Sequence, residues 1–255
     1  MEEINDTEIE DQNIQDEQQD KKEQEEEDAI PVTAETLPLT TELISQNLSL
    51  IARTAVGLSH AYTRLELHEK EITNLNAISS FPHLRYIVKL INTGLFRQQL
   101  TSLDKLKYLQ HVNLAKNKLK EFTITHWPML SFLNLNDNKL TENVVFEDFP
   151  ELLHLELRGN KLKSNPKMSL PKLQRLYLAA NEIETLKFPD LPHLQVLNLR
   201  QNKIKNPIEQ IENYRLEILN RLTKLDRLDK EQVSQEEREE AAIYNPKPIE
   251  TQPAV

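Results

Sequence analysis

The chain of 255 residues contains no cysteine, only three glycines and few aromatic residues. Without cysteine there can be no disulfide and no thiolate to act as a nucleophile or a metal ligand. The three glycines (Gly57, Gly94 and Gly159) lie too far apart to form a glycine-rich loop that cradles a phosphate. No apolar run is long enough to span a bilayer, and the N-terminus lacks the apolar segment of a signal peptide. We therefore expect a soluble cytoplasmic protein with no membrane contact.

The charge of the chain is unevenly distributed. Residues 1–28 carry 14 Asp or Glu and two Lys, a net charge of −12, and the whole chain carries −10, so the remainder sums to +2. Because the acidic stretch has few side chains that could be buried, we predict that residues 1–36 form a disordered tail. This tail is either a solvated segment or an arm that docks on a basic partner. A near-neutral body disfavours nucleic acid as a partner, since phosphates require a clustered basic face.

A repeat with a period of about 21 residues runs through most of the chain. The clearest copies are LQHVNLAKNKL, LSFLNLNDNKL, LLHLELRGNKL, LQRLYLAANEI and LQVLNLRQNKI, which begin at Leu109, Leu130, Leu152, Leu173 and Leu194. Their alignment brings six asparagines into register: Asn92, Asn117, Asn138, Asn160, Asn181 and Asn202. Two upstream copies, which begin at Tyr62 and Leu84, are degenerate: Lys70 replaces the asparagine in the first, and Lys89 replaces an apolar residue in the second.

The repeat predicts a leucine-rich-repeat solenoid. Leucines at alternate positions form a short strand with one apolar face, and the asparagine amide can bond backbone groups where the chain leaves that strand. A proline lies two residues before the first leucine of five copies, which leaves room only for short 3₁₀ or extended segments on the return path. We therefore predict an α/β fold over residues 61–229, a curved solenoid with short parallel strands on its concave face.

The two ends of a solenoid must be sealed, because a terminal repeat would otherwise expose its core. Residues 41–55 place apolar side chains on one helical face, which predicts an N-terminal helical cap over residues 37–60. Near the other end, Leu225 and Leu228 repeat the leucine frame once more. The stretch SQEEREEAAIY then predicts a helix, so residues 230–255 are expected to form a C-terminal cap helix and a proline-broken, disordered tail.

No set of residues predicts catalysis. Glu66 and Glu156 occupy equivalent strand positions four repeats apart, roughly 19 Å at about 4.8 Å per strand, too far to act on one bond. His111 and His154 are two repeats apart, about 10 Å, and lack further ligands for a metal ion. We expect no enzyme activity, no metal, no cofactor and no small-molecule substrate.

The concave face is the candidate binding site. The residues that alternate with the core leucines form columns across the strands: the first runs Arg64, Tyr86, His111, Phe132, His154, Arg175, Val196, and the second Glu66, Val88, Asn113, Asn134, Glu156, Tyr177, Asn198. A third contains His68, Leu90, Ala115, Asn136, Arg158, Ala179 and Arg200. Aromatic and arginine residues are enriched in interface hot spots, although scattered exposed aromatics are also normal. The predicted protein-binding residues are Tyr86, His111, Phe132, Asn134, His154, Glu156, Arg158, Arg175, Tyr177 and Arg200, with Phe132 and Tyr177 close together.

The flanks of the repeats carry a more specific resemblance. The stretch LTTELISQNLSLIARTAVGLSHAYTRLELHEKEITNL from Leu39, the HLRY from His83, the RLDKE from Arg227 and the acidic run from Glu236 resemble the leucine-rich repeat-containing protein 23 family. Members of that family are components of the radial spokes of motile cilia and flagella. The resemblance covers residues 37–243, but the chain has fewer repeats than the animal member, and residues 87–99 are irregular.

The resemblance implies a non-catalytic scaffold in the cytoskeleton of the cilium or flagellum, where its partners are other radial-spoke and axonemal proteins. Two other functions remain open: a regulatory subunit that docks on a protein phosphatase, and an adaptor of another cytosolic complex. The GLSHAY segment from Gly57 favours the spoke protein, because the phosphatase-binding relatives lack it.

Overall fold

The computed structural model describes residues 39–53, 59–68, 75–91, 100–124, 126–141, 144–184, 190–202 and 214–244. Residues 37–255 form one compact unit, to which all of these belong. The predicted tails, residues 1–36 and 245–255, lie outside the described residues, as does Asn92 of the predicted asparagine series.

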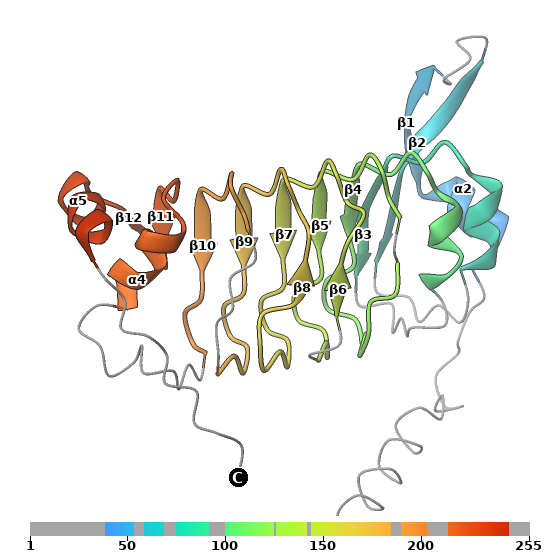
Figure 1. The fold of residues 1–255 in the computed structure, drawn as a ribbon. Coiled ribbons are helices and arrows are strands. Elements are labelled where there is room, and N and C mark those ends of the chain that lie inside the picture. The colour runs from blue at the N-terminus through green and yellow to red at the C-terminus, as the bar shows by residue number, and fades with distance from the viewer. Residues whose placement is uncertain are drawn as a thin grey trace, which may run out of the picture. The chain divides into compact units, whose positions relative to one another are not determined.

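One ten-stranded sheet runs through the compact unit (Figure 1). Its strands, in sheet order, are β1 (Leu48–Arg53), β2 (His60–His68), β3 (Tyr86–Ile91), β4 (His111–Asn113), β5 (Phe132–Asn134), β7 (His154–Glu156), β9 (Arg175–Tyr177), β10 (Val196–Asn198), β11 (Arg227–Leu228) and β12 (Glu231–Gln232). Neighbours from β2 to β11 pair in parallel, and β1 and β12 pair antiparallel at the two ends. Each strand of the repeats begins a new coil of the chain, so the predicted parallel-strand solenoid is confirmed.

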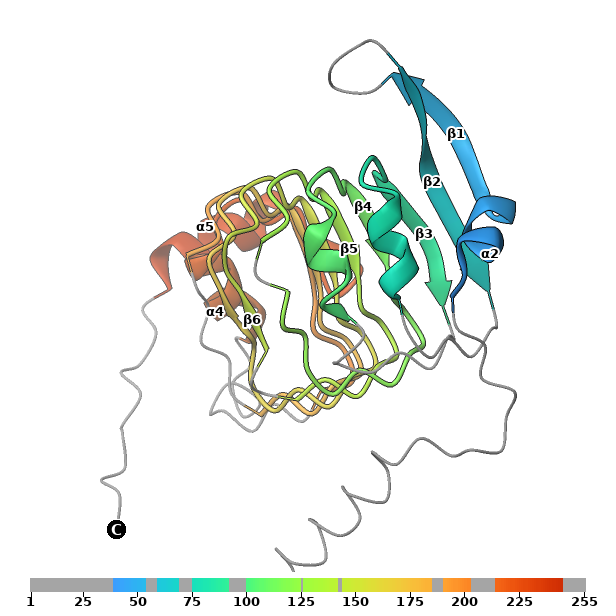
Figure 2. The ribbon, with the colours of Figure 1, turned by 90° about the vertical axis from the view of Figure 1, so that its right-hand side faces the viewer.

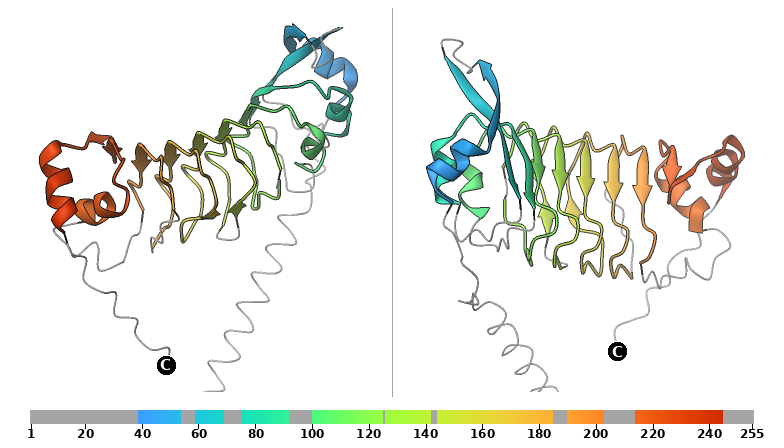
Figure 3. Two further views of the ribbon diagram at one scale, coloured as in Figure 1. Left: turned by 45° about the horizontal axis from the view of Figure 1, so that its top comes forward. Right: turned by 180° about the vertical axis from the view of Figure 1, so that it is seen from behind.

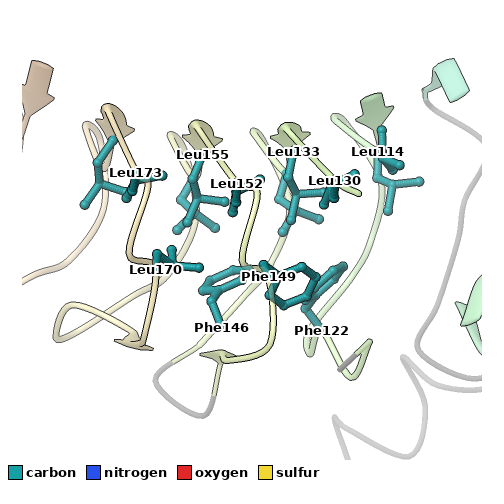
Figure 4. Close-up of a cluster of buried hydrophobic side chains, with 14 of the residues drawn as sticks. Leu114, Phe122, Leu130, Leu133, Phe146, Phe149, Leu152, Leu155, Leu170 and Leu173 are labelled. Atoms are coloured by element: carbon teal, nitrogen blue, oxygen red, sulfur yellow. The ribbon is translucent and has the colours of Figure 1, made fainter. Parts of the chain in front are cut away.

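The leucines of the repeat form a continuous core beneath the sheet. Leu133 and Leu155 are fully buried at the centres of β5 and β7, and the first leucine of each repeat packs beside them from the preceding turn (Figure 4). The wider part of the core contains aromatic side chains, with the rings of Phe122 and Phe146 5.6 Å apart between their centroids. The buried Trp127 donates its indole N–H to the carbonyl of Leu103 at 3.2 Å, so its polar group is satisfied.

The asparagines of the repeat tie each coil to the one before it. The Nδ2 of Asn160 donates to the carbonyls of Leu157 in its own repeat and Leu135 in the previous one, both at 3.0 Å. Its Oδ1 accepts from the backbone N–H of Leu140 at 3.0 Å. The equivalent bonds recur at Asn138, Asn181 and Asn202. The predicted asparagine ladder therefore connects the repeats from Asn117 onward.

The return path of each coil is short and mostly irregular, as the prolines predict. It contains the 3₁₀ helices η1 (Asn76–Ser80) and η2 (Leu103–Lys105) near the N-terminal end. Further along, β6 (Val145–Phe146) and β8 (Lys167–Met168) pair in parallel as a separate two-stranded sheet. Figure 2 shows the return path facing the large sheet across the core.

The N-terminal cap differs from the prediction. Helix α2 covers only Thr41–Gln46, with Thr40 as its N-cap and Asn47 as its C-cap. The following residues, predicted as part of the same helix, instead form β1, which pairs with β2 as an extended hairpin (Figure 2). The helical prediction is therefore wrong for Leu48–Arg53. Pairing β1 with β2 satisfies the backbone groups at the edge of the sheet, and this outweighs local helix propensity.

The C-terminal cap repeats the strand frame and adds two helices. Strand β11 pairs with β10 through Arg227 and Leu228, as the position of Leu228 predicts. Helix α4 (Tyr214–Arg221) was not predicted, whereas α5 (Gln235–Ile243) lies where the sequence predicts a helix. Ser234 and Glu237 form a capping box at the start of α5. No helix in the described ranges is long and apolar enough to cross a membrane.

Candidate protein-binding face

The exposed side of the large sheet is the face predicted as the concave face, and we keep that name for it. Its first column is in the predicted register: Arg64 pairs with Tyr86, and the pairing continues through His111, Phe132, His154, Arg175 and Val196. In the right-hand view of Figure 3 the strands of the repeats lie side by side, so equivalent residues of successive strands are neighbours.

Four rings pack against one another along this face, and we call them the ring ladder: His111, Phe132, His154 and Tyr177. The rings of His111 and Phe132 stack at 4.0 Å with an interplanar angle of 3°. Phe132 then meets His154 edge to face at 4.8 Å, and His154 meets Tyr177 at 5.3 Å. Phe132 and Tyr177 were expected to lie close together, but they share the ring of His154 instead. A continuous half-buried aromatic surface results.

The Glu156 carboxylate makes polar contacts with His154 of the ring ladder and with Asn136. The Oε2 of Glu156 accepts a hydrogen bond from Asn136 Nδ2 at 2.6 Å. The Oε1 of the same carboxylate lies 3.2 Å from His154 Nε2, close enough for an ion pair but not aligned as a hydrogen bond. His154 Nε2 is thus buried with no hydrogen-bond partner among the described residues. The contact with Glu156 therefore holds the imidazole of His154 in place without a well-aligned hydrogen bond.

Burial lowers the pKa of His111, and the nearby Arg64 and His154 lower it further, against an opposing effect of Glu156. The neutral imidazole is therefore the favoured form in the fold, which suits its stacking on the apolar ring of Phe132.

The second and third columns depart from the prediction near the N-terminal end. A bulge between Leu65 and Glu66 shifts the register, so that Glu66 pairs with Lys89 instead of Val88. The same shift places Leu90 in the core, fully buried, although it was predicted on the concave face. The bulge allows an apolar residue to occupy the core position that the repeat frame assigns to Lys89.

The other residues predicted to bind a partner either make hydrogen bonds within the fold or are exposed on the concave face. The Oδ1 of Asn134 accepts from the backbone N–H of Asn136 at 2.9 Å, which stabilises the turn after β5. The hydroxyl of Tyr86 donates to Gln110 Oε1 at 3.2 Å. The last three predicted residues are exposed arginines at the C-terminal end of the face: Arg158, Arg175 and Arg200.

Three residues of this surface were missed by the sequence analysis. Arg227 lies beside Val196 and continues the first column; the position of Leu228 could have revealed it. Ile51 and Tyr62 pair across the β1–β2 hairpin with 63% and 49% of their surface exposed. Ile51 was missed because Leu48–Arg53 was interpreted as helix, and Tyr62 was missed because the first column was begun two residues later, at Arg64.

The geometry gives no support to metal chemistry at the histidines. Phe132 stands between His111 and His154, so the two imidazoles do not converge on one point. Within the part of the chain that the structure describes, no three His, Asp or Glu side chains are grouped so that they could hold a metal ion.

Comparison with known proteins places the chain in a family. A family model described as leucine-rich repeats (2 copies) matches residues 171–216. Leucine-rich repeat-containing protein 23 of Xenopus tropicalis is 32% identical over 272 residues, which cover 81% of this chain and 78% of that protein. The chain belongs to the leucine-rich repeat-containing protein 23 family. The human member is 31% identical over 143 residues, which cover 55% of this chain but only 40% of the human protein.

A solved leucine-rich-repeat protein of Leptospira interrogans is also similar, with 26% identity, a TM-score of 0.49 and coverage of 70% of this chain and 45% of that one. The family membership and the repeat architecture support a protein-interaction scaffold.

Proposed function

We propose that this chain is a non-catalytic structural subunit of the radial spoke in the axoneme of motile cilia, and that it holds other spoke proteins on its concave face. Family membership supports the cellular role, since the sequence is 32% identical to its Xenopus relative over most of both chains. The ring ladder supports the mode of binding.

The ring ladder is the observation on which the binding site depends. Its four rings are half-buried and present a continuous aromatic edge on a sheet that the asparagine ladder holds rigid. Such pre-ordered aromatic side chains lose little conformational freedom on binding, and aromatic residues are enriched at interface hot spots.

The test is recovery of spoke proteins from ciliary extract by the immobilised chain, with the recovered proteins identified by mass spectrometry. The double variant Phe132→Ala with Tyr177→Ala removes two of the four rings. We expect binding to weaken by about 2 kcal/mol or more, roughly thirtyfold in affinity.

The matched control is Val145→Ala with Met129→Ala. Both side chains are large, apolar and exposed, at 37% and 46%, and Val145 lies on β6 across the core from the concave face. The control should recover spoke proteins as wild type does. Equal recovery by the two double variants would contradict the proposed face, and recovery of a phosphatase catalytic subunit in place of spoke proteins would contradict the proposed role.

A further inference from the structure

Four exposed arginines gather at the C-terminal end of the concave face, and we call them the arginine quartet: Arg158, Arg175, Arg200 and Arg227. Arg175 and Arg227 flank Val196 in the first column. Gly159 N–H donates to Ala179 O at 3.0 Å and Ala180 N–H to Arg200 O at 2.8 Å, which places Arg158 and Arg200 on either side of Ala179. Each pair of arginines is therefore separated by one small or branched apolar residue.

The quartet has no ion-pair partner among the described residues. Two carboxylates beside it have other partners: Glu156, two residues before Arg158, contacts Asn136 and His154, and Asp229 accepts from the backbone N–H of Leu199 at 2.7 Å. Asp229 also accepts from the hydroxyl of Tyr214 at 3.3 Å. Burial raises the pKa of the Asp229 carboxyl, and the charge of Arg200 is among the effects that oppose this shift. Within the described part of the chain, the four guanidinium groups are therefore free of ion pairs.

The N-terminal end of the same face has a different character. There Arg64 is paired with Glu66 at 2.6 Å, and the neighbouring first-column residues Tyr86, His111 and Phe132 carry aromatic rings. The concave face therefore changes along the sheet from a mainly aromatic surface to a cationic one, with Tyr177 at the boundary. A partner that lies along the whole face must bring negative charge to the C-terminal end only.

We propose that the arginine quartet binds an acidic, extended segment of a partner protein, in which Asp or Glu residues recur every third position. Guanidinium groups bind carboxylates with two parallel hydrogen bonds, which favours carboxylates over a diffuse anionic surface. This proposal rests on the proposed function, because it specifies which kind of partner segment the concave face takes.

The spacing follows from the register. The members of each arginine pair are two strands apart, about 9.6 Å at about 4.8 Å per strand. A segment in the polyproline II conformation rises about 3.1 Å per residue with three residues per turn, so residues three apart lie on the same side and about 9.3 Å apart. An acidic residue at every third position therefore meets both arginines of a pair.

The experiment measures fluorescence anisotropy of labelled peptides with the full chain. The probe is a 12-residue peptide of four Glu-Pro-Ser units, and a second peptide of the same composition carries its four glutamates in one block. We expect the spaced peptide to bind more tightly than the blocked one. The variants Arg158→Gln with Arg200→Gln, and Arg175→Gln with Arg227→Gln, should each weaken binding of the spaced peptide by about tenfold or more, or about 1.4 kcal/mol.

The control, Lys107→Gln with Lys167→Gln, removes the same charge from exposed positions outside the quartet and should change the affinity by less than about twofold. Thermal melts should show that all variants fold, since the substituted side chains are exposed. Equal weakening by the control, or equal affinity for the two peptides, would overturn the proposal. The proposal would also be overturned if a 12-nucleotide oligothymidine bound as tightly as the spaced peptide and depended on the same arginines.

The peptide tests can fail independently of the proposed function. If they fail while spoke proteins still bind through Phe132 and Tyr177, the proposed function stands and only the acidic segment is withdrawn.

Discussion

At the scale of single residues, the buried asparagines stabilise the fold mainly through the backbone groups of other residues that they hydrogen-bond. Asn160 satisfies the backbone carbonyls of Leu135 and Leu157 and the backbone N–H of Leu140, three groups that water cannot reach. An unsatisfied buried group costs about 1–3 kcal/mol, so the side-chain amide stabilises the fold through groups that belong to other residues.

Asn160→Ala should therefore lower the free energy of unfolding by about 2–4 kcal/mol. The measurement is urea unfolding followed by circular dichroism. Lys161→Ala, at the exposed neighbouring position, serves as the control and should change the stability by less than about 0.5 kcal/mol. A loss below about 1 kcal/mol for Asn160→Ala would show that the asparagine ladder does not hold the coils together.

One of the two histidines of the ring ladder, His111, makes the stability depend on pH. Because the folded-state pKa of His111 is lowered, the unfolded chain binds more protons between that pKa and the ordinary value of 6.5. Stability should therefore fall as the pH drops through 6.5 toward the folded-state pKa. His111→Phe keeps a ring against Phe132 and should reduce this loss between pH 7.5 and 5.5 in urea unfolding, whereas the exposed control His126→Gln should not. Identical slopes for wild type and His111→Phe would contradict the assignment.

At the scale of elements, the strands could be predicted because each one is repeated. Leu133 and Leu155 occupy equivalent positions, and five clear copies of one pattern define both the strand and the register of its neighbours. An element that occurs only once in the chain cannot be predicted from a repeated pattern. Strand β1 was predicted as helix, since its apolar residues also fit a helical face, and only the open edge of β2 decides in favour of a strand. Helix α4 has no counterpart elsewhere in the chain.

The candidate binding face, too, could be predicted from the sequence only in part. The first column followed from the repeat and is confirmed from Arg64 to Val196. The prediction of the second and third columns failed near β3, because a bulge changes which residues face the core. In the sequence, Lys89 at an apolar position of the repeat marks the irregularity but does not reveal the new register. The order of the rings could not be predicted either, since it depends on how the side chain of Tyr177 leans toward His154.

The stacking of similar coils also predicts which part of the solenoid unfolds when one coil is destabilised. Leu135 is fully buried in the middle of the repeats, so Leu135→Ala should lower the free energy of unfolding by about 2–5 kcal/mol. Because each coil contacts only its neighbours, hydrogen-exchange protection should be lost mainly within residues 109–181. Leu153→Ala, at a position that is 37% exposed, is the control. An equal loss of protection over the whole compact unit would show that the coils do not behave as separate units.

At the scale of the whole molecule, the negative charge is concentrated at one end of the sequence. Residues 1–28 carry a net charge of −12, and Leu39 is the first buried leucine among the described residues. We expect deletion of residues 1–28 to leave the melting temperature within experimental error, because the deleted segment has few side chains that could add to a core. The measurement is differential scanning calorimetry of the full and shortened chains. A decrease of several degrees would show that the acidic segment stabilises the folded unit.

The central claim is that the chain is a spoke scaffold that acts through its concave face, and localisation in a ciliated cell tests it most directly. The wild-type chain and the Val145→Ala, Met129→Ala control, each with a fluorescent tag, should label the axoneme. The Phe132→Ala, Tyr177→Ala variant, at equal abundance, should lose most of that signal. A wild-type chain found throughout the cytoplasm or in the nucleus, without axonemal signal, would contradict the account.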